Sequence, residues 1–360
     1  MHIELIDESN YAGCMADRVL PALERCKDEG WFDAEAVEAG ATTEQPDGLG
    51  PAPTPGKLHY VCYDAGKFDA IRANSATATF RGAIVISHGF TEFAGKYAEM
   101  VWYFLLAGYS VCVLEHRGHG HSVRDIDDKS LVWIDDWRRY VADLEAFAAT
   151  VGQQYAGGMP LNLYAHSMGG GIGAAVLEQH PTLFDKAVLT APMIAPSTGM
   201  PNWLARILAE GVCAFGLGRH IVFGQSEFTP EISMADHPGA SEARIRWFQQ
   251  LRIDDECNQT YAATFEWVRQ ALRLSSSVIR PSACAQVETP MLVFQAGRDM
   301  WVLNGPQDRF VKLVQDGGGQ ARIVRVPESL HEIFSMPNAV LGPYVHRILE
   351  FFDDPLTMAL

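Results

Sequence analysis

Residues 161–175 read LNLYAHSMGGGIGAA, so an apolar run of strand length passes directly into a glycine-rich helical pattern. Two classes of α/β protein use a turn of this kind. In one, Ser167 would lie on a sharp, strained turn that exposes its hydroxyl as a nucleophile. In the other, residues 169–174 would match G-x-G-x-x-G/A, the loop that binds a dinucleotide. The rest of the chain has to distinguish the two.

Apolar runs of strand length alternate with helical patterns from Leu58 to residue 193 and again from residue 286 onwards. The runs GAIVIS, VCVL and MLVFQA are almost continuously apolar, as expected of strands that are covered on both faces. This alternation predicts an α/β fold with a mostly parallel central sheet flanked by helices. Between residues 194 and 285 we find only helical patterns and loops, which predicts a helical cap inserted late in the sheet.

The chain before Leu58 has a different pattern. Apolar residues recur at helical spacing over residues 9–29, and Gly30 is a typical helix stop. Residues 33–57 are acidic and rich in proline and glycine, as is typical of a surface loop or linker. We therefore predict three parts: an N-terminal helix and linker (1–57), an α/β core (58–193 and 286–360) and a helical cap (194–285).

The composition argues against several classes of function. The formal net charge is −16, which argues against a nucleic-acid partner and against electrostatic docking on anionic membranes. The seven cysteines are scattered and contain no C-x-x-C, so we expect reduced thiols in a cytoplasmic protein. No apolar stretch reaches membrane-spanning length. At most a transient contact with a membrane surface is expected.

The dinucleotide interpretation requires an acid at the end of the next strand, about twenty residues on, to hold the ribose. The next strand, KAVLTAPM, ends without one, and Asp185 precedes that strand, at the wrong end. The fingerprint also usually opens its domain, whereas three predicted strands precede this turn. The sequence therefore favours the nucleophile, and no cofactor is expected.

The nucleophile interpretation requires small residues two positions before and after the serine, and Ala165 and Gly169 meet that requirement. It also requires a histidine that accepts the serine proton and an acid that orients the histidine, in the chain order serine, acid, histidine. Asp299 follows the strand MLVFQA, and His331 follows the strand ARIVRV. Both are therefore expected at the carboxyl ends of strands, where open α/β sheets place their sites.

Other acids and histidines fit this order less well. Asp308 and Asp316 fall within or after a predicted helix, His166 adjoins the nucleophile, and His346 lies on the last predicted helix. Either member of the chosen pair, taken alone, could be an ordinary loop residue. Three residues in the required order, each at the end of a strand, are much harder to obtain by chance.

Attack on a carbonyl group also requires backbone N–H donors for the charge that develops on its oxygen. One donor would be the amide of Met168, directly after the nucleophile. The other is expected in the loop HGF after an early strand, where we assign the amide of Phe90. A plain connection between a strand and a helix would have the same appearance.

Residues 115–121, EHRGHGH, contain three histidines and an acid, a composition that some zinc sites share. No partner group of cysteines or histidines with metal-ligand spacing occurs elsewhere in the sequence. We therefore predict no metal and interpret the segment as a structural loop, with histidines that make hydrogen bonds beneath the site.

Together these segments resemble the α/β-hydrolase superfamily, and specifically its branch of bacterial lysophospholipases and monoacylglycerol lipases, often grouped as serine aminopeptidase-like hydrolases. HGFTEFAGKY resembles the HGxxEHxxRY of that branch, EHRGHGHS its DHRGHGxS, AHSMGG its GHSMGG, QAGRDMWV its GxxDxxV, and SLHE its final histidine motif. The resemblance covers about residues 58–353 and implies the α/β-hydrolase fold with the cap as a lid. The site residues that it implies are the triad Ser167, Asp299 and His331 and the oxyanion amides of Phe90 and Met168.

Three positions depart from the pattern of the branch. Glu115 replaces an aspartate and Ala165 replaces a glycine, and both changes leave the chemistry intact. Phe93 stands where the branch often has histidine. Its larger ring is expected to alter packing at the mouth of the pocket.

The residues and the resemblance predict a serine hydrolase that cleaves carboxylic esters through an acyl-enzyme on Ser167. An apolar stripe within residues 201–215 of the cap suggests an acyl-chain pocket, and hence lysophospholipids or monoacylglycerols as substrates. The alternative is that this stripe only packs on the core. Its members are Trp203, Leu204, Ile207, Leu208, Val212 and Phe215, with the polar residues Asn202, Arg206 and Glu210 opposite.

Two other functions stay open at this point. An aminopeptidase or amidase of the same superfamily would need acids that recognise the amino group of its substrate. The cap offers Glu227, Glu231, Asp236 and Asp254. A relative that binds a ligand without catalysis would need no triad, so the intact triad argues against it.

Overall fold

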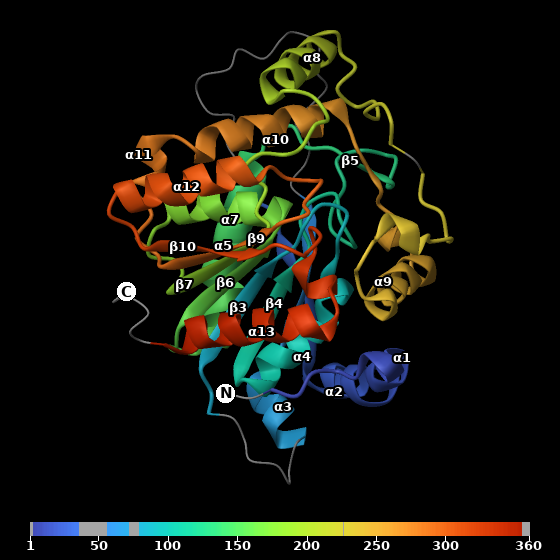
Figure 1. Cartoon of the computed structure of the whole chain (residues 1–360), viewed down its shortest axis with the longest axis vertical. Coiled ribbons are helices and arrows are strands. Elements are labelled where there is room, and N and C mark those ends of the chain that lie inside the picture. Colours follow the sequence, from blue (N-terminus) through green and yellow to red (C-terminus); the bar gives the residue numbers. More distant parts are fainter. Residues whose placement is uncertain (1–2, 36–55, 72–78, 226, 355–360) are drawn as a thin grey trace.

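The computed structural model describes residues 3–35, 56–71, 79–225 and 227–354 of the 360-residue chain. At its centre is an eight-stranded sheet with the strand order β1-β2-β4-β3-β6-β7-β9-β10 (Figure 1). Its strands are Lys27–Asp33 (β1), Lys57–Tyr63 (β2), Gly82–Ser87 (β3), Tyr109–Leu114 (β4), Leu161–His166 (β6), Lys186–Thr190 (β7), Met291–Ala296 (β9) and Ala321–Val326 (β10).

Most of this sheet is parallel, as the alternating pattern predicted. Every neighbouring pair from β4 to β10 is parallel, whereas β2 is antiparallel to β4 and β1 is antiparallel to β2. The almost continuously apolar runs form β3, β4 and β9, in which every residue is buried. β3 and β6 are neighbours in register, with Ser87 opposite Ala165, so the loops that follow these two strands begin side by side.

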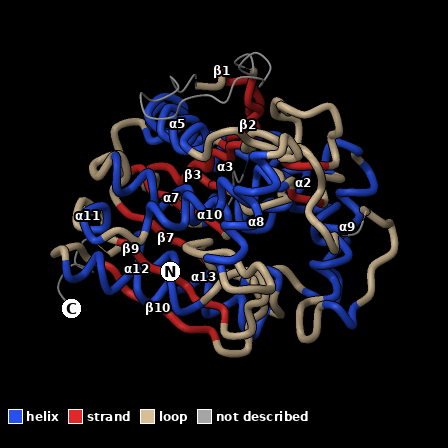
Figure 2. The backbone as a smooth tube through the Cα atoms, turned by 90° about the horizontal axis from the view of Figure 1, so that it is seen from above, coloured by secondary structure: helices blue, strands red, loops and turns tan. Residues whose placement is uncertain are grey.

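Helices cover both faces of the sheet (Figures 1 and 2). One face carries Ala65–Ile71 (α3), Ala98–Leu106 (α4) and Asn338–Asp353 (α13). The other carries Arg138–Phe147 (α5), Met168–Gln179 (α7), Phe265–Val278 (α10), Pro281–Cys284 (α11) and Asn304–Asp316 (α12). The predicted α/β class, with helices flanking a mostly parallel sheet, is confirmed. Within the described ranges, no helix combines the length and apolar character needed to cross a bilayer.

The N-terminal segment differs from its prediction. The expected helix over 9–29 consists of Tyr11–Cys14 (α1), a π-helical turn and Leu20–Cys26 (α2), and it ends three residues early. Lys27–Asp33 is instead the edge strand β1, and Gly30 lies inside it, opposite Tyr60. Pairing with β2 overrides the local helical pattern here, because strand formation depends on the partner strand as well as on local sequence. The proline- and glycine-rich part of the predicted linker, residues 36–55, lies outside the described residues.

The region predicted to be a helical cap contains Asn202–Ala214 (α8), Glu242–Asp254 (α9) and α10. α10 packs against both α7 and α8, whereas α9 lies apart from them and close to α1 (Figure 1). The expectation of helices and loops alone was wrong in one detail. Ala262–Ala263 (β8) pairs in parallel with Leu131–Val132 (β5) in a second, two-stranded sheet.

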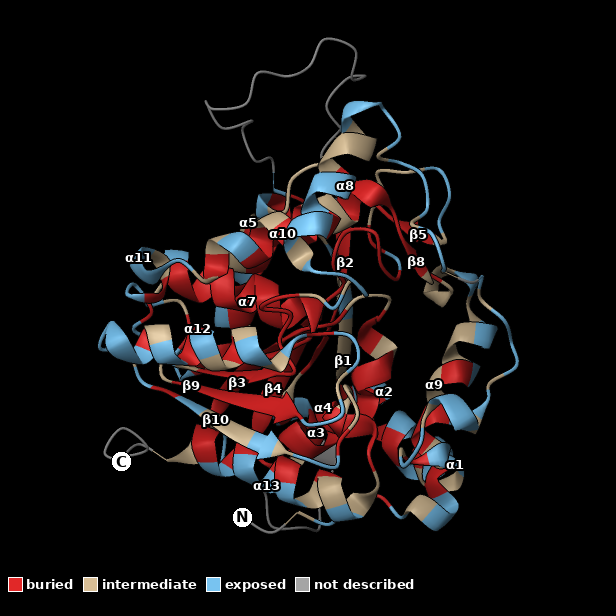
Figure 3. Ribbon diagram, turned by 45° about the horizontal axis from the view of Figure 1, so that its top comes forward, coloured by how far each residue is buried: buried red, intermediate tan, exposed pale blue. Residues whose placement is uncertain are grey.

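α8 presents its apolar stripe to solvent, so simple packing of that stripe on the core is wrong for this helix. Its buried residues are the small Ala205 and Ala209. Glu210, on the polar side, forms ion pairs with Arg269 and Arg273 of α10. Figure 3 shows most of α8 as exposed or intermediate surface. The exposed members of the stripe are Trp203, Leu204, Ile207, Leu208 and Phe215.

A buried arginine attaches α9 to the rest of the molecule. Arg244 donates from Nε and Nη2 to the two carboxylate oxygens of Glu99 on α4, at 2.8 and 2.7 Å. Its Nη1 lies 3.0 Å from a carboxylate oxygen of Glu8 in the N-terminal segment. Tyr11 and Tyr103 also donate to Glu99. The N-terminal segment, α4 and α9 therefore share one buried ionic contact.

Replacement of Arg244 should strongly destabilise the protein. In Arg244→Met, Glu99 stays buried without its cation, and loss of one partner of a buried ion pair costs about 3–5 kcal/mol. The measurement is the free energy of unfolding in urea, followed by tryptophan fluorescence.

Arg246→Met is the matched control on the same helix. Arg246 pairs with Glu242 at 2.7 Å, but these side chains are 57% and 61% exposed. Exposed pairs contribute at most about 1 kcal/mol. Equal losses in the two variants would contradict a structural role for the buried contact.

Candidate active site

Ser167 lies at a strained turn between β6 and α7. Its backbone has φ 53° and ψ −118°, a conformation that residues other than glycine rarely adopt. The next turn of chain approaches β3 so closely that a Cβ atom on Gly169 would lie 2.2 Å from the carbonyl oxygen of Ser87. A side chain does not fit there. The glycine at this position therefore allows the backbone to pack closely around the serine, as the nucleophile interpretation requires.

The structure brings Ser167, Asp299 and His331 together. Nε2 of His331 lies 2.8 Å from Oγ of Ser167, and Nδ1 of His331 lies 2.7 Å from Oδ2 of Asp299. The Asp299 side chain is fully buried, and its Oδ1 accepts hydrogen bonds from the amides of Trp301 and Val302. The carboxylate is thus fixed on one side by the backbone, and its other oxygen orients the imidazole.

Three of the rival acids and histidines are engaged elsewhere. Asp308 on α12 pairs with Arg325, and Asp316 pairs with Lys312. His346 lies on α13 and pairs with Glu350. These groups contact neither Ser167 nor His331 in the part of the chain that the structure describes.

The two backbone amides chosen as oxyanion donors belong to different segments. Met168 is the first residue of α7, so its N–H is one of those that no carbonyl of the helix accepts. Phe90 lies in the loop after β3, next to the carboxyl end of β6. Its ring packs against Trp267 of α10 and His119, with ring centroids 4.2 and 5.8 Å apart.

The histidine-rich loop after β4 lies beneath this site. Nε2 of His116 is 2.8 Å from Oγ of Ser87, and Nδ1 of His119 is 2.9 Å from the carbonyl oxygen of Arg117. Burial, together with the neighbouring His88, holds the pKa of both imidazoles well below the usual range. No metal-ligand cluster occurs among the described residues. The contacts are those of a structural loop.

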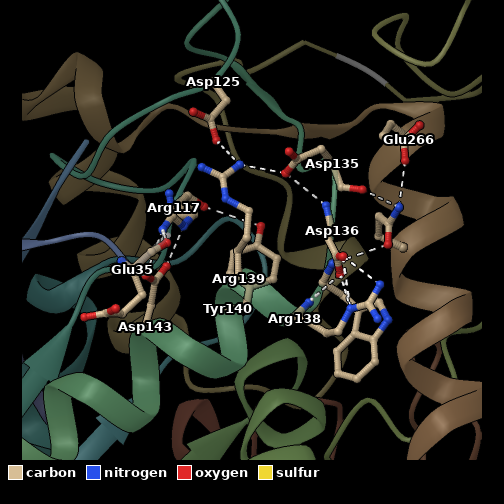
Figure 4. Close-up of polar contacts among 12 residues, drawn as sticks. Glu35, Arg117, Asp125, Asp135, Asp136, Arg138, Arg139, Tyr140, Asp143 and Glu266 are labelled. Atoms are coloured by element: carbon tan, nitrogen blue, oxygen red, sulfur yellow. Dashed lines mark hydrogen bonds and ion pairs between the residues drawn. The ribbon is translucent and has the colours of Figure 1, made fainter. Parts of the chain in front are cut away.

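Buried arginines fix this loop from the side of α5 (Figure 4). Arg117 donates to both carboxylate oxygens of Asp143, at 2.5 and 2.8 Å, and to the carbonyl oxygen of Glu35. Arg139 lies 2.8 Å from Asp125 and 2.7 Å from Asp135. The segment after β1 and the loop after β4 are therefore held to the same helix.

Sequence reasoning did not single out three charged side chains beside the triad. Lys96 lies between Glu92 and Glu332. Glu92 accepts a hydrogen bond from the amide of Gly89 in the Phe90 loop, and Glu332 directly follows His331. The sequence could have pointed to these three residues, because Glu92 and Lys96 belong to the motif segment HGFTEFAGKY and Glu332 directly follows His331. Phe93, the departure from the branch pattern, is buried and stacks on Phe248 of α9 with ring centroids 5.6 Å apart.

Comparison with known proteins finds relatives among hydrolases. A family model described as serine aminopeptidase, S33, matches residues 78–338. Lysophospholipase L2 of Escherichia coli strain K12 is 31% identical over 281 residues, which cover 75% of this chain and 80% of that protein. Monoacylglycerol lipase of Mycolicibacterium smegmatis is 32% identical over 127 residues, covering 35% of this chain and 43% of that protein.

Solved structures show the same fold at lower identity. A soluble variant of monoglyceride lipase from Saccharomyces cerevisiae, in complex with a substrate analog, superposes with a TM-score of 0.63 at 17% identity. The match covers 89% of this chain and 96% of that one. This likeness concerns the fold.

Replacement of the acid tests the assignment of Asp299. A fluorophosphonate probe, which reacts with an activated serine, is expected to label the wild-type protein. In Asp299→Asn the histidine loses the carboxylate that orients it, and such a change lowers rates by about 10⁴-fold in a well-studied triad. We expect a fall of that order in the labelling rate.

Asp308→Asn is the control, because Asp308 follows the same strand but pairs with Arg325 on the surface. Its labelling rate should stay within about twofold of wild type. A larger loss in Asp308→Asn than in Asp299→Asn would contradict the assignment, and absence of labelling in the wild-type protein would indicate a ligand-binding relative.

Proposed function

The chain belongs to the serine aminopeptidase S33 family of α/β-hydrolases, and on that premise we propose that it hydrolyses carboxylic esters of lipids through an acyl-enzyme on Ser167. The observation that carries the proposal is the continuous contact from Ser167 through His331 to Asp299, at 2.8 and 2.7 Å. Lysophospholipids and monoacylglycerols are the proposed substrates, because the similar proteins are lysophospholipases and monoacylglycerol lipases.

The mechanism follows from these contacts. His331 accepts the Ser167 proton as Oγ attacks the ester carbonyl, and the amides of Phe90 and Met168 donate to the developing oxyanion. The tetrahedral intermediate collapses, and His331 gives its proton to the departing alcohol. Water, activated by the same histidine, then releases the fatty acid and restores the serine. No cofactor takes part in these steps.

The aminopeptidase alternative has less support. Recognition of a substrate ammonium group favours a carboxylate that is partly removed from water. The four cap acids available for this role, Glu227, Glu231, Asp236 and Asp254, are all exposed. Ester hydrolysis is therefore the function that the described residues support best.

An exposed apolar surface adjoins the proposed site and suits a lipid substrate. Asn202 at the start of α8 donates to the carbonyl oxygen of Pro196, and Pro196 pairs with Val302, next to Trp301. Large exposed apolar surfaces commonly mark interaction sites. We call this surface the apolar rim; its residues are Met200, Trp203, Leu204, Ile207, Leu208, Met300, Trp301 and Leu303.

We propose that the apolar rim contacts the aggregated lipid from which the substrate is drawn. The net charge of −16 disfavours attraction to anionic headgroups, so the contact is apolar and transient. The seven cysteines are all free thiols in the structure, which supports the cytoplasm as the proposed location.

Replacement of the nucleophile tests the activity. Ser167→Ala should lose more than about 10³-fold in hydrolysis of p-nitrophenyl butyrate, because no other group can form the acyl-enzyme. A panel of monoacylglycerols, lysophosphatidylcholines and aminoacyl-naphthylamides then identifies the substrate class of the wild-type protein. Full activity in Ser167→Ala, or turnover of the naphthylamides in preference to the esters, would contradict the proposal.

A charged side chain on the apolar rim should lower hydrolysis of aggregated substrate without changing hydrolysis of soluble substrate. Ile207 is 62% exposed, so Ile207→Glu leaves p-nitrophenyl butyrate hydrolysis unchanged. Hydrolysis of a monoacylglycerol in phosphatidylcholine vesicles should fall about 10-fold, since burial of one such side chain contributes about 1.5–3 kcal/mol.

Met159→Glu is the matched control for this experiment. Met159 is 45% exposed and precedes β6, at the opposite end of that strand from Ser167. It should not alter hydrolysis of either substrate. Equal vesicle activity in Ile207→Glu and wild type would contradict the lipid contact.

A further inference from the structure

A buried lysine lies between two carboxylates behind the proposed triad. Nζ of Lys96 is 2.8 Å from Oε1 of Glu92 and 2.5 Å from Oε1 of Glu332. The Lys96 and Glu92 side chains are 3% and 4% exposed, and that of Glu332 is 29% exposed. The Phe248 ring of α9 covers the ammonium group, with its centroid 4.0 Å from Nζ. The contact is therefore largely shielded from water.

All three groups carry their charges at neutral pH. Burial alone would raise the pKa of Glu92 and of Glu332, but the Lys96 ammonium and the His166 imidazole together outweigh it and lower both values. Burial would lower the pKa of Lys96, but the two carboxylates outweigh it and raise that value. The cluster thus holds one positive and two negative charges.

Glu92 connects the lysine to the oxyanion loop and to the nucleophile turn. Its Oε2 accepts a hydrogen bond of 2.6 Å from the amide of Gly89, directly before Phe90. Its Oε1 lies 3.1 Å from Nδ1 of His166, directly before Ser167. A Cβ atom on Gly89 would lie 2.9 Å from both side chains, so this contact requires glycine there.

Glu332 connects the lysine to the loop of the proposed base. It directly follows His331, and its Oε2 accepts a hydrogen bond of 2.8 Å from Ser335. The rings of His166 and His331 lie with centroids 4.9 Å apart. The three loops that carry the oxyanion donor, the nucleophile and the base are thus joined through one ammonium group.

We propose that Lys96 is a positioning residue, which holds the His331 loop in register with the Phe90 loop and Ser167 through its two carboxylate partners. The inference rests on the proposed function, because it assigns Lys96 a role in ester hydrolysis. Among the described residues, the polar contacts of Lys96 are with Glu92 and Glu332 and not with Ser167, Asp299 or His331. Its contribution is the geometry of the base and of the oxyanion donor, in which errors of about 1 Å cost about 100-fold in rate.

The charges of the cluster also act on His331. Asp299 and His166 contact its imidazole, Glu332 directly follows it in the chain, and Arg252 of α9 interacts with Glu332. Removal of the lysine charge leaves two carboxylates, which stabilise the imidazolium form. Removal of the Glu332 charge leaves a neutral pair, which has the opposite effect.

The experiment measures kcat, KM and the pH profile of kcat/KM with p-nitrophenyl butyrate. Lys96→Met should lower kcat about 10- to 100-fold, with KM within about threefold of wild type. The acid limb of its profile should move to higher pH by about 0.5–1 unit. Glu332→Gln should move the limb to lower pH, and Lys96→Arg should restore both kcat and the limb.

The double variant Lys96→Met/Glu332→Gln distinguishes two effects of the cluster: the effect of its contacts on kcat and the effect of its charge on the acid limb. Its cluster keeps the net charge of wild type, because Glu92 alone remains charged. We expect the acid limb to return to the wild-type pH while kcat stays low. Recovery of kcat together with the limb would show that charge alone mattered and would overturn the positioning role.

Lys312→Met is the matched control, since Lys312 pairs with Asp316 on the exposed face of α12. Unchanged kcat and an unmoved acid limb in Lys96→Met would overturn the inference. Should Lys96→Met not fold, Glu332→Gln decides, and a wild-type kcat together with an unmoved limb in that variant would overturn the inference. Absence of ester hydrolysis in wild type would instead contradict the proposed function.

Discussion

The contact between the nucleophile turn and the end of β3 is the constraint on which the site depends. Gly169 lies against the carbonyl oxygens of Ser87 and His88, where a Cβ atom would be 2.2 and 2.5 Å away. The two backbones therefore touch, and the loop that carries Phe90 begins where Ser167 turns. Because both strands are central in the sheet, a shift of either would separate the proposed nucleophile from its proposed oxyanion donor.

The proximity of Ser167, Asp299 and His331 could be predicted from the sequence, because it follows from the order of parallel strands in the sheet. The carboxyl ends of parallel strands meet at one edge, so residues that follow β6, β9 and β10 come together even though Ser167 and His331 are 164 positions apart. The edge strand β1 and the outward-facing stripe of α8 could not be predicted in the same way. The first depends on pairing with a distant strand, and the second reverses the usual relation between an apolar face and burial.

The buried lysine shows a different limit of sequence reasoning. Glu92 and Lys96 are four residues apart, the spacing of an ordinary ion pair on an exposed helix. What distinguishes them is the surrounding structure: a carboxylate 236 positions away and an aromatic ring from α9 close the pair off from water. Because of this burial, the Glu92–Lys96 pair connects three loops instead of lying on an exposed helix surface.

The contact between the N-terminal segment and α13 joins residues that are far apart in the sequence. Asn338, at the start of α13, donates from its amide to Glu8 and from its side chain to the carbonyl oxygen of Ile6, across 330 and 332 positions. Ile6 is itself fully buried. α4 supplies part of the surface on which the N-terminal segment packs, and α13 supplies a second part that is synthesised about 330 residues after Glu8. The contact of Ile6 and Glu8 with Asn338 can therefore form only after most of the described residues have been synthesised.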